Sequence, residues 1–264
     1  MTVSAERPLP LSVAIIARNE EARLPRCLES VSGLAAEIVV LDSGSTDATV
    51  AVAERFGARV EITDWPGFTV QKNRALVACH QPWVLSLDAD EAVSPALADA
   101  IRTLFAAGDP PCTGYCINRR NRYLGVWLRH AWTPEWRLRL VARDQARWTG
   151  GRVHEQLTVT GPTGRLAGDL LHESYDRLDD HLHRTIAYAR LGAEDLIARG
   201  KPFRAHKLLL SPLGRLMRIL LLQQSWRDGW RGVLIAASSM LAAFAKHAFV
   251  LEHHLRNTER NRRP

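Results

Sequence analysis

Two aspartates at the end of an apolar run are the residues of this chain with the clearest chemistry. The run at residues 83–87 (WVLSL) leads directly into Asp88, Ala89 and Asp90. Two ionised carboxylates one residue apart are costly to bury without partners. Mg²⁺ or Mn²⁺ would satisfy them, because these ions prefer oxygen ligands and often bridge carboxylates to substrate phosphates. The spacing therefore predicts a metal site, with capping of the following helix as the structural alternative.

Polar groups also follow two earlier apolar runs. Residues 18–21 (RNEE) follow the run at 11–17, and residues 42–47 (DSGSTD) follow the run at 37–41. An open α/β sheet binds its ligands beyond the carboxyl ends of its strands, where loops enter the helices. We therefore expect both loops to lie on one rim with the aspartate pair, although some of these residues are also good helix caps.

The elements that must position these groups alternate along the first half of the chain. Apolar, β-branched runs predict strands, and the spacing between them predicts helices. The predicted strands are 11–17, 37–41, 58–62 and 83–87, and the predicted helices are 20–31, 47–56, 69–79 and 95–105. This alternation predicts an α/β fold with a mainly parallel central sheet covered on both faces.

The second half of the chain has a different pattern. Shorter strand-like runs extend from residue 114 to 175, and everything after residue 178 has helical spacing. Pro202 and Pro212 predict breaks between the helices. We therefore predict one domain at 1–177 and a helical C-terminal region at 178–264.

Composition allows a large buried core and places the excess charge in the tail. The chain has 264 residues, is 46% apolar and carries a formal net charge of +7. Residues 201–264 contain 12 Lys and Arg against 3 Asp and Glu, whereas residues 1–200 contain 23 against 25. A basic, apolar tail favours contact with an anionic membrane surface, with a solvated helical face as the alternative.

Four motifs in the first half together resemble the family-two glycosyltransferases of GT-A fold: ARNEE (17–21), VLDSGSTDAT (40–49), GFTVQKNRAL (67–76) and LSLDADE (85–91). Three later segments are similar to the lipopolysaccharide inner-core β-glucosyltransferases: 114–130, 137–157 and 168–175. The resemblance covers about residues 11 to 176. It implies an inverting, metal-assisted enzyme that moves a sugar, glucose from UDP-glucose, onto a lipopolysaccharide-core or similar envelope glycan.

The resemblance also assigns roles on the donor side of the site. The residues it places there are Asn19, Glu20, Asp42, Ser43, Gly44, Asp47, Lys72, Arg74 and Asp88. Asn19 and Glu20 would meet the nucleotide, and Asp42 would accept a hydrogen bond from the base or ribose. Lys72 and Arg74 would lie beside the diphosphate, unless they form a solvated helix face.

Asp88 and Asp90 correspond to the family's metal-binding DxD motif, which would hold Mg²⁺ or Mn²⁺. His172 is either a further metal ligand or a hydrogen-bonded core histidine. Since the metal occupies this pair, the base that deprotonates the acceptor hydroxyl must be another carboxylate. The match to the subgroup's VHE segment favours Glu155, with His154 to orient it. The other candidate bases are Glu135, Asp144 and Glu173.

Arginines and aromatic residues interleave between residues 119 and 152, which favours an acceptor site for an anionic glycan. About half of them are expected to serve packing instead. Two other functions compete: a polyprenyl-phosphate sugar transferase, and a non-enzymatic nucleic-acid-binding protein suggested by the pI near 9.7. The acidic clusters on the predicted rim argue against nucleic acid.

The expected location is the cytoplasm, at the inner face of the cell membrane. The N-terminus lacks a charged segment that leads into a long apolar run, so no secretory signal is expected. Residues 233–251 have a spanning length, but Lys246 and His247 interrupt them. The preceding basic, leucine-rich stretch is typical of a helix that lies in the headgroup region.

Overall fold

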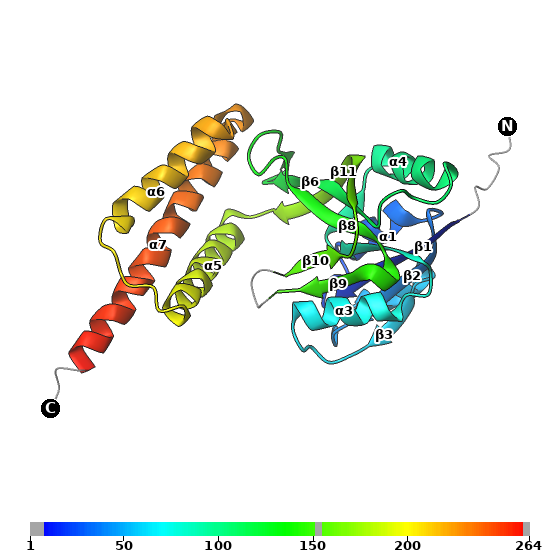
Figure 1. The fold of residues 1–264 in the computed structure, drawn as a ribbon, viewed down its shortest axis with the longest axis horizontal. Coiled ribbons are helices and arrows are strands. Elements are labelled where there is room, and N and C mark those ends of the chain that lie inside the picture. Colours follow the sequence, from blue (N-terminus) through cyan, green and yellow to red (C-terminus); the bar gives the residue numbers. More distant parts are fainter. Residues whose placement is uncertain (1–7, 151–154, 261–264) are drawn as a thin grey trace. The chain divides into compact units, whose positions relative to one another are not determined.

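The computed structural model describes residues 8–150 and 155–260 (Figure 1). This part of the chain folds into two compact units. Residues up to 120, together with 134–173, form the sheet unit, and residues 121–133 join those from 174 onward in the helical unit. The division predicted at residue 177 placed the segment 121–133 in the first domain, whereas the structure packs it with the C-terminal helices.

The main sheet combines parallel and antiparallel strands in the order β3-β2-β1-β4-β8-β6-β11-β5, and β7 pairs with β6. A separate ribbon pairs β10 with β9. The strands are β1 (Leu9–Ala17), β2 (Ala35–Asp42), β3 (Arg59–Ile62), β4 (Trp83–Asp88), β5 (Glu91–Val93), β6 (Gly114–Tyr123), β7 (Val126–Trp127), β8 (Trp136–Ala142), β9 (Ala146–Thr149), β10 (Gln156–Val159) and β11 (Thr163–Tyr175). Strands β3, β2, β1 and β4 are parallel, as predicted, and β8 begins the antiparallel part beside β4.

Helices cover both faces of the parallel strands, which explains why β1 is apolar along most of its length. The helices of the sheet unit are α1 (Leu24–Val31), α2 (Thr49–Arg55), α3 (Phe68–Ala78) and α4 (Pro95–Ala106). One core packs α1, α2 and α4 against Val13 and Ile15 of β1. The other core packs α3 and Trp148 against Ala14 of β1 and Val39 of β2. The sequence pattern thus predicted these four helices and their two-sided packing.

The helical unit contains α5 (Leu178–Ala198), α6 (Lys207–Met217), a π-helical turn (Arg218–Leu222), a 3₁₀ turn (Ser225–Asp228) and α7 (Trp230–Arg260). Hydrogen bonds hold the segment 121–133 to it. Tyr123 Oη lies 2.8 Å from His181 Nδ1, and Ser238 Oγ lies 3.2 Å from His181 Nε2. The Asp228 carboxylate accepts the backbone amides of residues 129–131 at 2.7–2.9 Å.

Pro212 does not break the helix as predicted, because it lies inside α6. A proline in a helix interior removes one backbone hydrogen bond and crowds the preceding turn. Here Pro212 is buried, and α6 packs along α7, so tertiary packing offsets the local cost. The predicted break at Pro202 is confirmed, since this residue lies in the connection between α5 and α6.

Helix α7 is long and apolar enough to cross a membrane, by length and composition alone, over Trp230–Thr258. In the structure, 33% of its most apolar window is buried. A Cβ added at Gly192 of α5 would lie 3.2 Å from Lys246 Cδ, so the aliphatic part of Lys246 packs closely against α5. The burial of Lys246, together with nearby Arg215 and Lys207, lowers its pKa.

Candidate active site

The strand register brings the predicted rim together. Ala17, the last residue of β1, pairs with Asp42 at the end of β2, and Ile16 pairs with Asp88 at the end of β4. The three loops that follow these strands therefore leave the sheet at the same edge. The structure thus brings together the loops that sequence alone predicted as neighbours.

The first two loops are joined by hydrogen bonds through Asn19. Its side-chain Oδ1 accepts from the Thr46 backbone N at 2.8 Å, and its backbone N donates to Ser45 Oγ at 2.9 Å. Asn19 has a φ of 55°, a left-handed conformation that asparagine tolerates better than most residues. This residue therefore shapes the wall of the rim, and its predicted contact with a nucleotide stays a prediction.

Asp42 shapes its own loop. It is buried, and one carboxylate oxygen accepts the backbone amides of Gly44 at 2.9 Å and Ser45 at 2.8 Å. The other oxygen accepts from the Ser45 hydroxyl. Gly44 has a φ of 79°, which a residue with a side chain adopts at a cost. Neighbouring Ser43 accepts a bond from Gln71 Nε2 at 3.1 Å, which ties this loop to α3.

Glu20 and Asp47 lie where the same two loops enter α1 and α2. The Glu20 backbone N donates to Thr49 Oγ1 at 2.8 Å. Asp47 Oδ1 accepts from both the hydroxyl and the backbone N of Thr49, the latter at 3.0 Å. The bond from the Thr49 hydroxyl is the largest cause that lowers the Asp47 pKa. Both residues therefore take part in the hydrogen bonds of the rim, although the N-cap residues of α1 and α2 are Arg23 and Ala48, without side-chain caps.

The two predicted basic residues of α3 have different surroundings. Lys72 is buried, with its Nζ 2.8 Å from Asp88 Oδ1 and 4.4 Å from the centre of the Trp148 ring. Arg74 is instead 40% exposed and pairs with Asp64 at 2.6 Å. The structure therefore brings Lys72 to the aspartate motif and leaves Arg74 paired with Asp64 outside it.

Asp88 is held between two cations. Its Oδ1 contacts Lys72, and its Oδ2 accepts from Arg139 of β8 at 2.8 Å. Burial alone would raise the Asp88 pKa, but Lys72 and Arg139 outweigh this effect and keep the pKa well below its ordinary value. Arg139 also donates to the fully buried Glu91 carboxylate at 2.7 Å, and Glu91 accepts the Asp88 backbone amide at 3.0 Å. Asp88 is therefore rigidly held and ionised.

Sequence reasoning missed the parts that Glu91 and Trp148 play in this site. The signal in the sequence was that Glu91 directly follows the aspartate motif, and the structure places it in the short buried strand β5. Trp148 is 4% exposed, and its indole N–H is buried without a hydrogen-bond partner among the described residues. Its ring covers Lys72, so Trp148 fixes the position of the ammonium group.

Asp90 and His172 lie together on the other side of the motif. His172 Nε2 is 3.3 Å from Asp90 Oδ2, and His172 pairs with Glu91 in the β11–β5 ladder. The donor atoms of two neighbouring ligands of a small divalent ion lie about 3 Å apart, so the spacing of this carboxylate oxygen and imidazole nitrogen fits such an ion. Over residues 8–150 and 155–260, no group of three or more His, Cys, Asp or Glu is arranged to hold a metal.

Glu155 lies beside the Lys72–Asp88 pair, with its Oε1 3.7 Å from Lys72 Nζ. His154, predicted to orient it, is outside the described residues. The three competing carboxylates are each in ion pairs with arginine: Glu135 with Arg119, Asp144 with Arg143, and Glu173 with Arg26. Of the candidate bases, Glu155 is therefore the one placed beside the Asp88 ion pair.

The predicted acceptor residues separate into several groups. Arg139 is buried and Arg119 is half-buried, and both form ion pairs with carboxylates. Tyr123 and Trp132 belong to the core of the helical unit. Trp136 remains 38% exposed at the start of β8, where the Arg165 guanidinium lies 4.6 Å from its ring centre. The expectation that many of these residues serve packing agrees with this distribution.

The fold and the rim define a GT-A glycosyltransferase. The chain belongs to glycosyl transferase family 2, whose model matches residues 12–157, more than half of its length. It is therefore a nucleotide-sugar-dependent glycosyltransferase, and this confirms the family predicted from the motifs.

The relatives it matches include a lipopolysaccharide core biosynthesis glycosyltransferase, LpsC, from Rhizobium meliloti. The two are 34% identical over 258 residues, which cover 93% of each chain. An uncharacterized glycosyltransferase from Rickettsia typhi is 28% identical over 89% of this chain and 84% of its own. Among solved structures, glucosyl-3-phosphoglycerate synthase from Mycobacterium tuberculosis, in complex with Mn²⁺, UDP and glucosyl-3-phosphoglycerate, is 22% identical. The match has a TM-score of 0.45 and covers 75% of this chain and 82% of that one.

The buried ion pairs predict a large stability effect for Arg139→Met. This change leaves Asp88 and Glu91 without their shared cation, and a broken buried ion pair typically costs about 3–5 kcal/mol. We expect that loss in the free energy of unfolding measured by urea denaturation. Arg137→Met, on the same strand but 45% exposed, is the matched control and should cost less than about 1 kcal/mol. Equal losses in both variants would contradict the account of this network.

Proposed function

We propose that the enzyme is an inverting transferase that moves glucose from UDP-glucose onto a lipopolysaccharide-core glycan with the help of Mg²⁺ or Mn²⁺. The relative from Rhizobium meliloti supports the acceptor class through its printed name and its full-length similarity. The observation that carries the proposal is the position of Glu155 beside the Lys72–Asp88 pair, on the rim that holds Asp90 and His172.

The donor would lie over the carboxyl ends of β1, β2 and β4. The loop built on Asp42 would face the uridine, with Asn19, Ser43 and Gly44 as its wall. Asp90 and His172 would hold the divalent ion. Asp88 would be a further ligand if one of its carboxylate oxygens bound the ion in place of Lys72 or Arg139. A bound ion would stabilise the negative charge of the departing diphosphate. The Lys72 ammonium, held by Asp88 and Trp148, adds positive charge to the same place.

Glu155 would act as the general base. Its carboxylate takes the proton from the acceptor hydroxyl while that oxygen bonds to the anomeric carbon. The bond between this carbon and the diphosphate oxygen breaks on the opposite side, and UDP leaves with the electron pair. Attack from the side opposite to the leaving group inverts the configuration, so α-linked glucose in the donor becomes β-linked in the product.

A product assay tests this function. The purified enzyme is incubated with radiolabelled UDP-glucose, Mn²⁺ and either truncated lipopolysaccharide or a polyprenyl phosphate. We expect label in the lipopolysaccharide and equimolar release of UDP. Label in the polyprenyl phosphate alone would replace the proposal by the competing lipid-carrier function.

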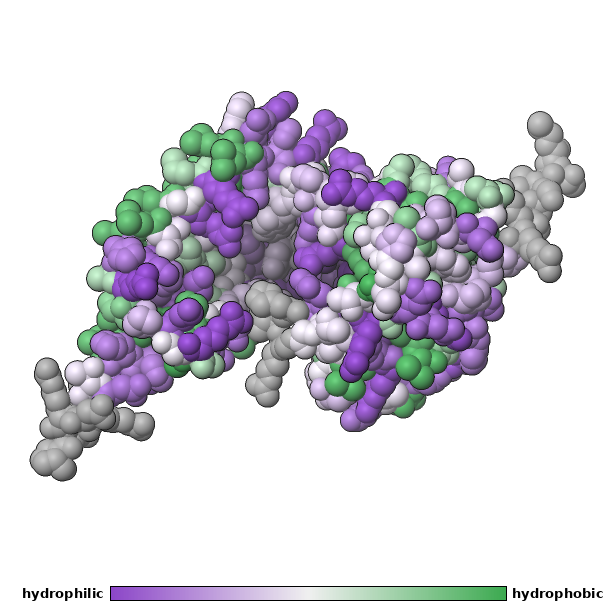
Figure 2. All heavy atoms as spheres, viewed as in Figure 1, coloured by the Kyte–Doolittle hydropathy of each residue, from purple (hydrophilic) through white to green (hydrophobic). Residues whose placement is uncertain are grey.

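We also propose that the helical unit binds the cytoplasmic face of the membrane. Figure 2 shows hydrophobic residues, in green, gathered along the α6 side of this unit. The exposed apolar side chains of α6 and the turns after it are Leu209, Leu210, Leu213, Met217, Leu221, Leu222 and Trp226. Arg215, Arg218 and Arg227 are exposed among them, so the segment combines apolar contact with attraction to anionic lipid.

Flotation with vesicles tests the membrane proposal. Replacing Leu209, Leu210 and Leu213 with serine removes apolar surface that would enter the lipid, so we expect at least about a tenfold loss of vesicle binding. Serine at Ile62 and Val77, exposed residues of the sheet unit, is the control and should leave binding unchanged. High salt should also weaken binding of the unchanged protein. Equal flotation of all three proteins would refute the proposal.

A further inference from the structure

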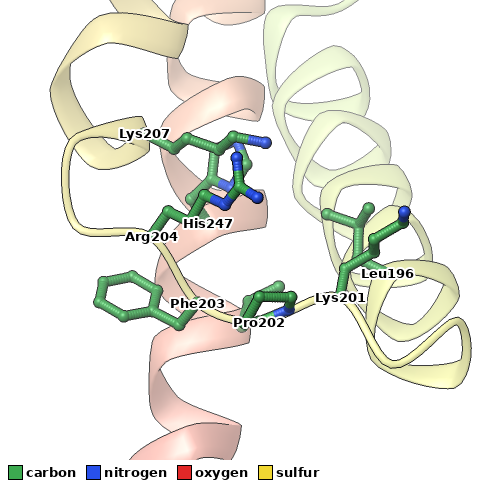
Figure 3. Close-up of a pocket in the computed structure, with 8 residues that line it drawn as sticks. Leu196, Lys201, Pro202, Phe203, Arg204, Lys207 and His247 are labelled. Atoms are coloured by element: carbon green, nitrogen blue, oxygen red, sulfur yellow. The ribbon is translucent and has the colours of Figure 1, made fainter.

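The helical unit contains a pocket that the sugar-transfer chemistry does not use. It has a volume of about 240 Å³ and lies between the α5–α6 connection and α7 (Figure 3). Its lining consists of Leu196, Lys201, Pro202, Phe203, Arg204, Lys207, His247 and Val250. Four of these side chains are basic and the others are apolar, so the pocket has a positive wall and an apolar wall.

The basic side chains of the pocket have no acidic partners in the described part of the chain. No ion pair or side-chain hydrogen bond joins Lys201, Arg204, Lys207 or His247 to a carboxylate among residues 8–150 and 155–260. Figure 3 places Arg204, Lys207 and His247 next to one another on one side of the pocket. The guanidinium of Arg204 and the ammonium of Lys207 carry like charges and repel each other, so an anion between them would be stabilised.

His247 is the buried polar group of the pocket, at 8% exposed. Its burial lowers its pKa, and Lys246, Lys207 and His206 lower it further. Lys207 is also the first residue of α6, whose first turn contains no acidic residue. The positive end of the helix dipole therefore adds to the charge of the side chains.

We propose that this pocket binds a phosphate group. Arg204 and Lys207 would donate charge-assisted hydrogen bonds to the phosphate oxygens, and His247 would donate a third through its ring N–H. The apolar wall of Leu196, Phe203 and Val250 would contact the carbon-containing part of a phosphate ester. A phospholipid headgroup and a phosphate on a soluble molecule share this chemistry.

NMR of the histidine side chains tests the proposal on the full chain, with His247 assigned by comparison with His247→Gln. Sodium phosphate is titrated at constant ionic strength, followed by vesicles of phosphatidylcholine with or without phosphatidylglycerol. We expect a saturable shift of the His247 signal. Saturation by phosphate identifies a soluble-phosphate site, and a response to vesicles alone identifies a lipid headgroup site.

A pair of matched double variants separates the pocket from general positive charge. Arg204→Gln with Lys207→Gln should weaken the binding at least about tenfold, because each removes a charge-assisted hydrogen bond. Arg184→Gln with Arg190→Gln removes the same charge from exposed positions of α5 in the same unit and should change the binding less than about twofold. Thermal unfolding checks that both variants fold, and the single Lys207→Gln variant replaces the first if it does not. No saturable shift with either probe, or equal weakening in both double variants, would overturn the proposal.

Discussion

Asp90→Asn should lower kcat for sugar transfer by about a thousandfold while the protein stays folded. The Asp90 carboxylate lies 3.3 Å from His172 Nε2, and we propose that the two hold the divalent ion. Removing one anionic ligand should weaken the binding of the ion, and with it the stabilisation of charge on the departing diphosphate. The loss of a comparable electrostatic contact lowers kcat by about 10²–10³. Turnover assays with varied Mn²⁺, together with calorimetric titration of UDP, measure both effects.

Asp99→Asn is the control for this variant, because Asp99 has a 75% exposed side chain on α4. It should leave kcat and the Mn²⁺ dependence unchanged. Full activity of the unchanged enzyme in excess EDTA, or more than about a tenth of its activity in Asp90→Asn, would refute the metal assignment.

Glu155→Gln should lower kcat by about 10²- to 10⁴-fold, the usual contribution of a positioned general base. The amide keeps the size of the side chain but cannot take the proton from the acceptor hydroxyl. The affinity for UDP-glucose should change little, since the proposed role of Glu155 is toward the acceptor. Single-turnover kinetics and calorimetric titration of UDP-glucose separate these two quantities.

Glu173→Gln and Glu135→Gln are the comparisons for the base. Both carboxylates pair with arginines, so their loss should affect stability more than the chemical step. If Glu155→Gln abolishes donor affinity but bound donor reacts normally, Glu155 binds the donor. If one of the other two variants shows the loss in kcat, that residue is the base.

The rim could be predicted from sequence because it depends on local patterns. Each of β1, β2 and β4 is an apolar run that ends in polar residues, and parallel strands bring such ends to one edge. The register of Ala17 with Asp42 and of Ile16 with Asp88 follows from that rule. The motifs at the ends of these strands predicted the family, and the match of the family model to residues 12–157 confirms this prediction.

The ion-pair network around Asp88 could not be predicted in the same way. Arg139 reaches Asp88 only because β8 lies antiparallel beside β4, with Leu85 opposite Leu140. This pairing joins residues about fifty positions apart, and nothing in the local pattern of β8 distinguishes the buried Arg139 from the exposed Arg137 as a partner of the motif. Packing against a distant strand decided which arginine became part of the site.

The grouping of residues 121–133 with the helical unit depends on similar long-range contacts. The backbone amides of residues 129–131 bond to Asp228, and Tyr123 bonds to His181. From sequence, the same segment read as a continuation of the strand-rich half. Pro212 is a related case, since its local preference predicted a helix end and packing along α7 prevailed.

Analysis of the transferred sugar tests the central proposal most directly. The enzyme is incubated with UDP-glucose, Mn²⁺ and truncated lipopolysaccharide, and the product is examined by mass spectrometry and by NMR of the anomeric proton. The account predicts one added hexose in β linkage, formed only when both acceptor and divalent ion are present. An α-linked product, or no acceptor-dependent transfer from UDP-glucose, would contradict it.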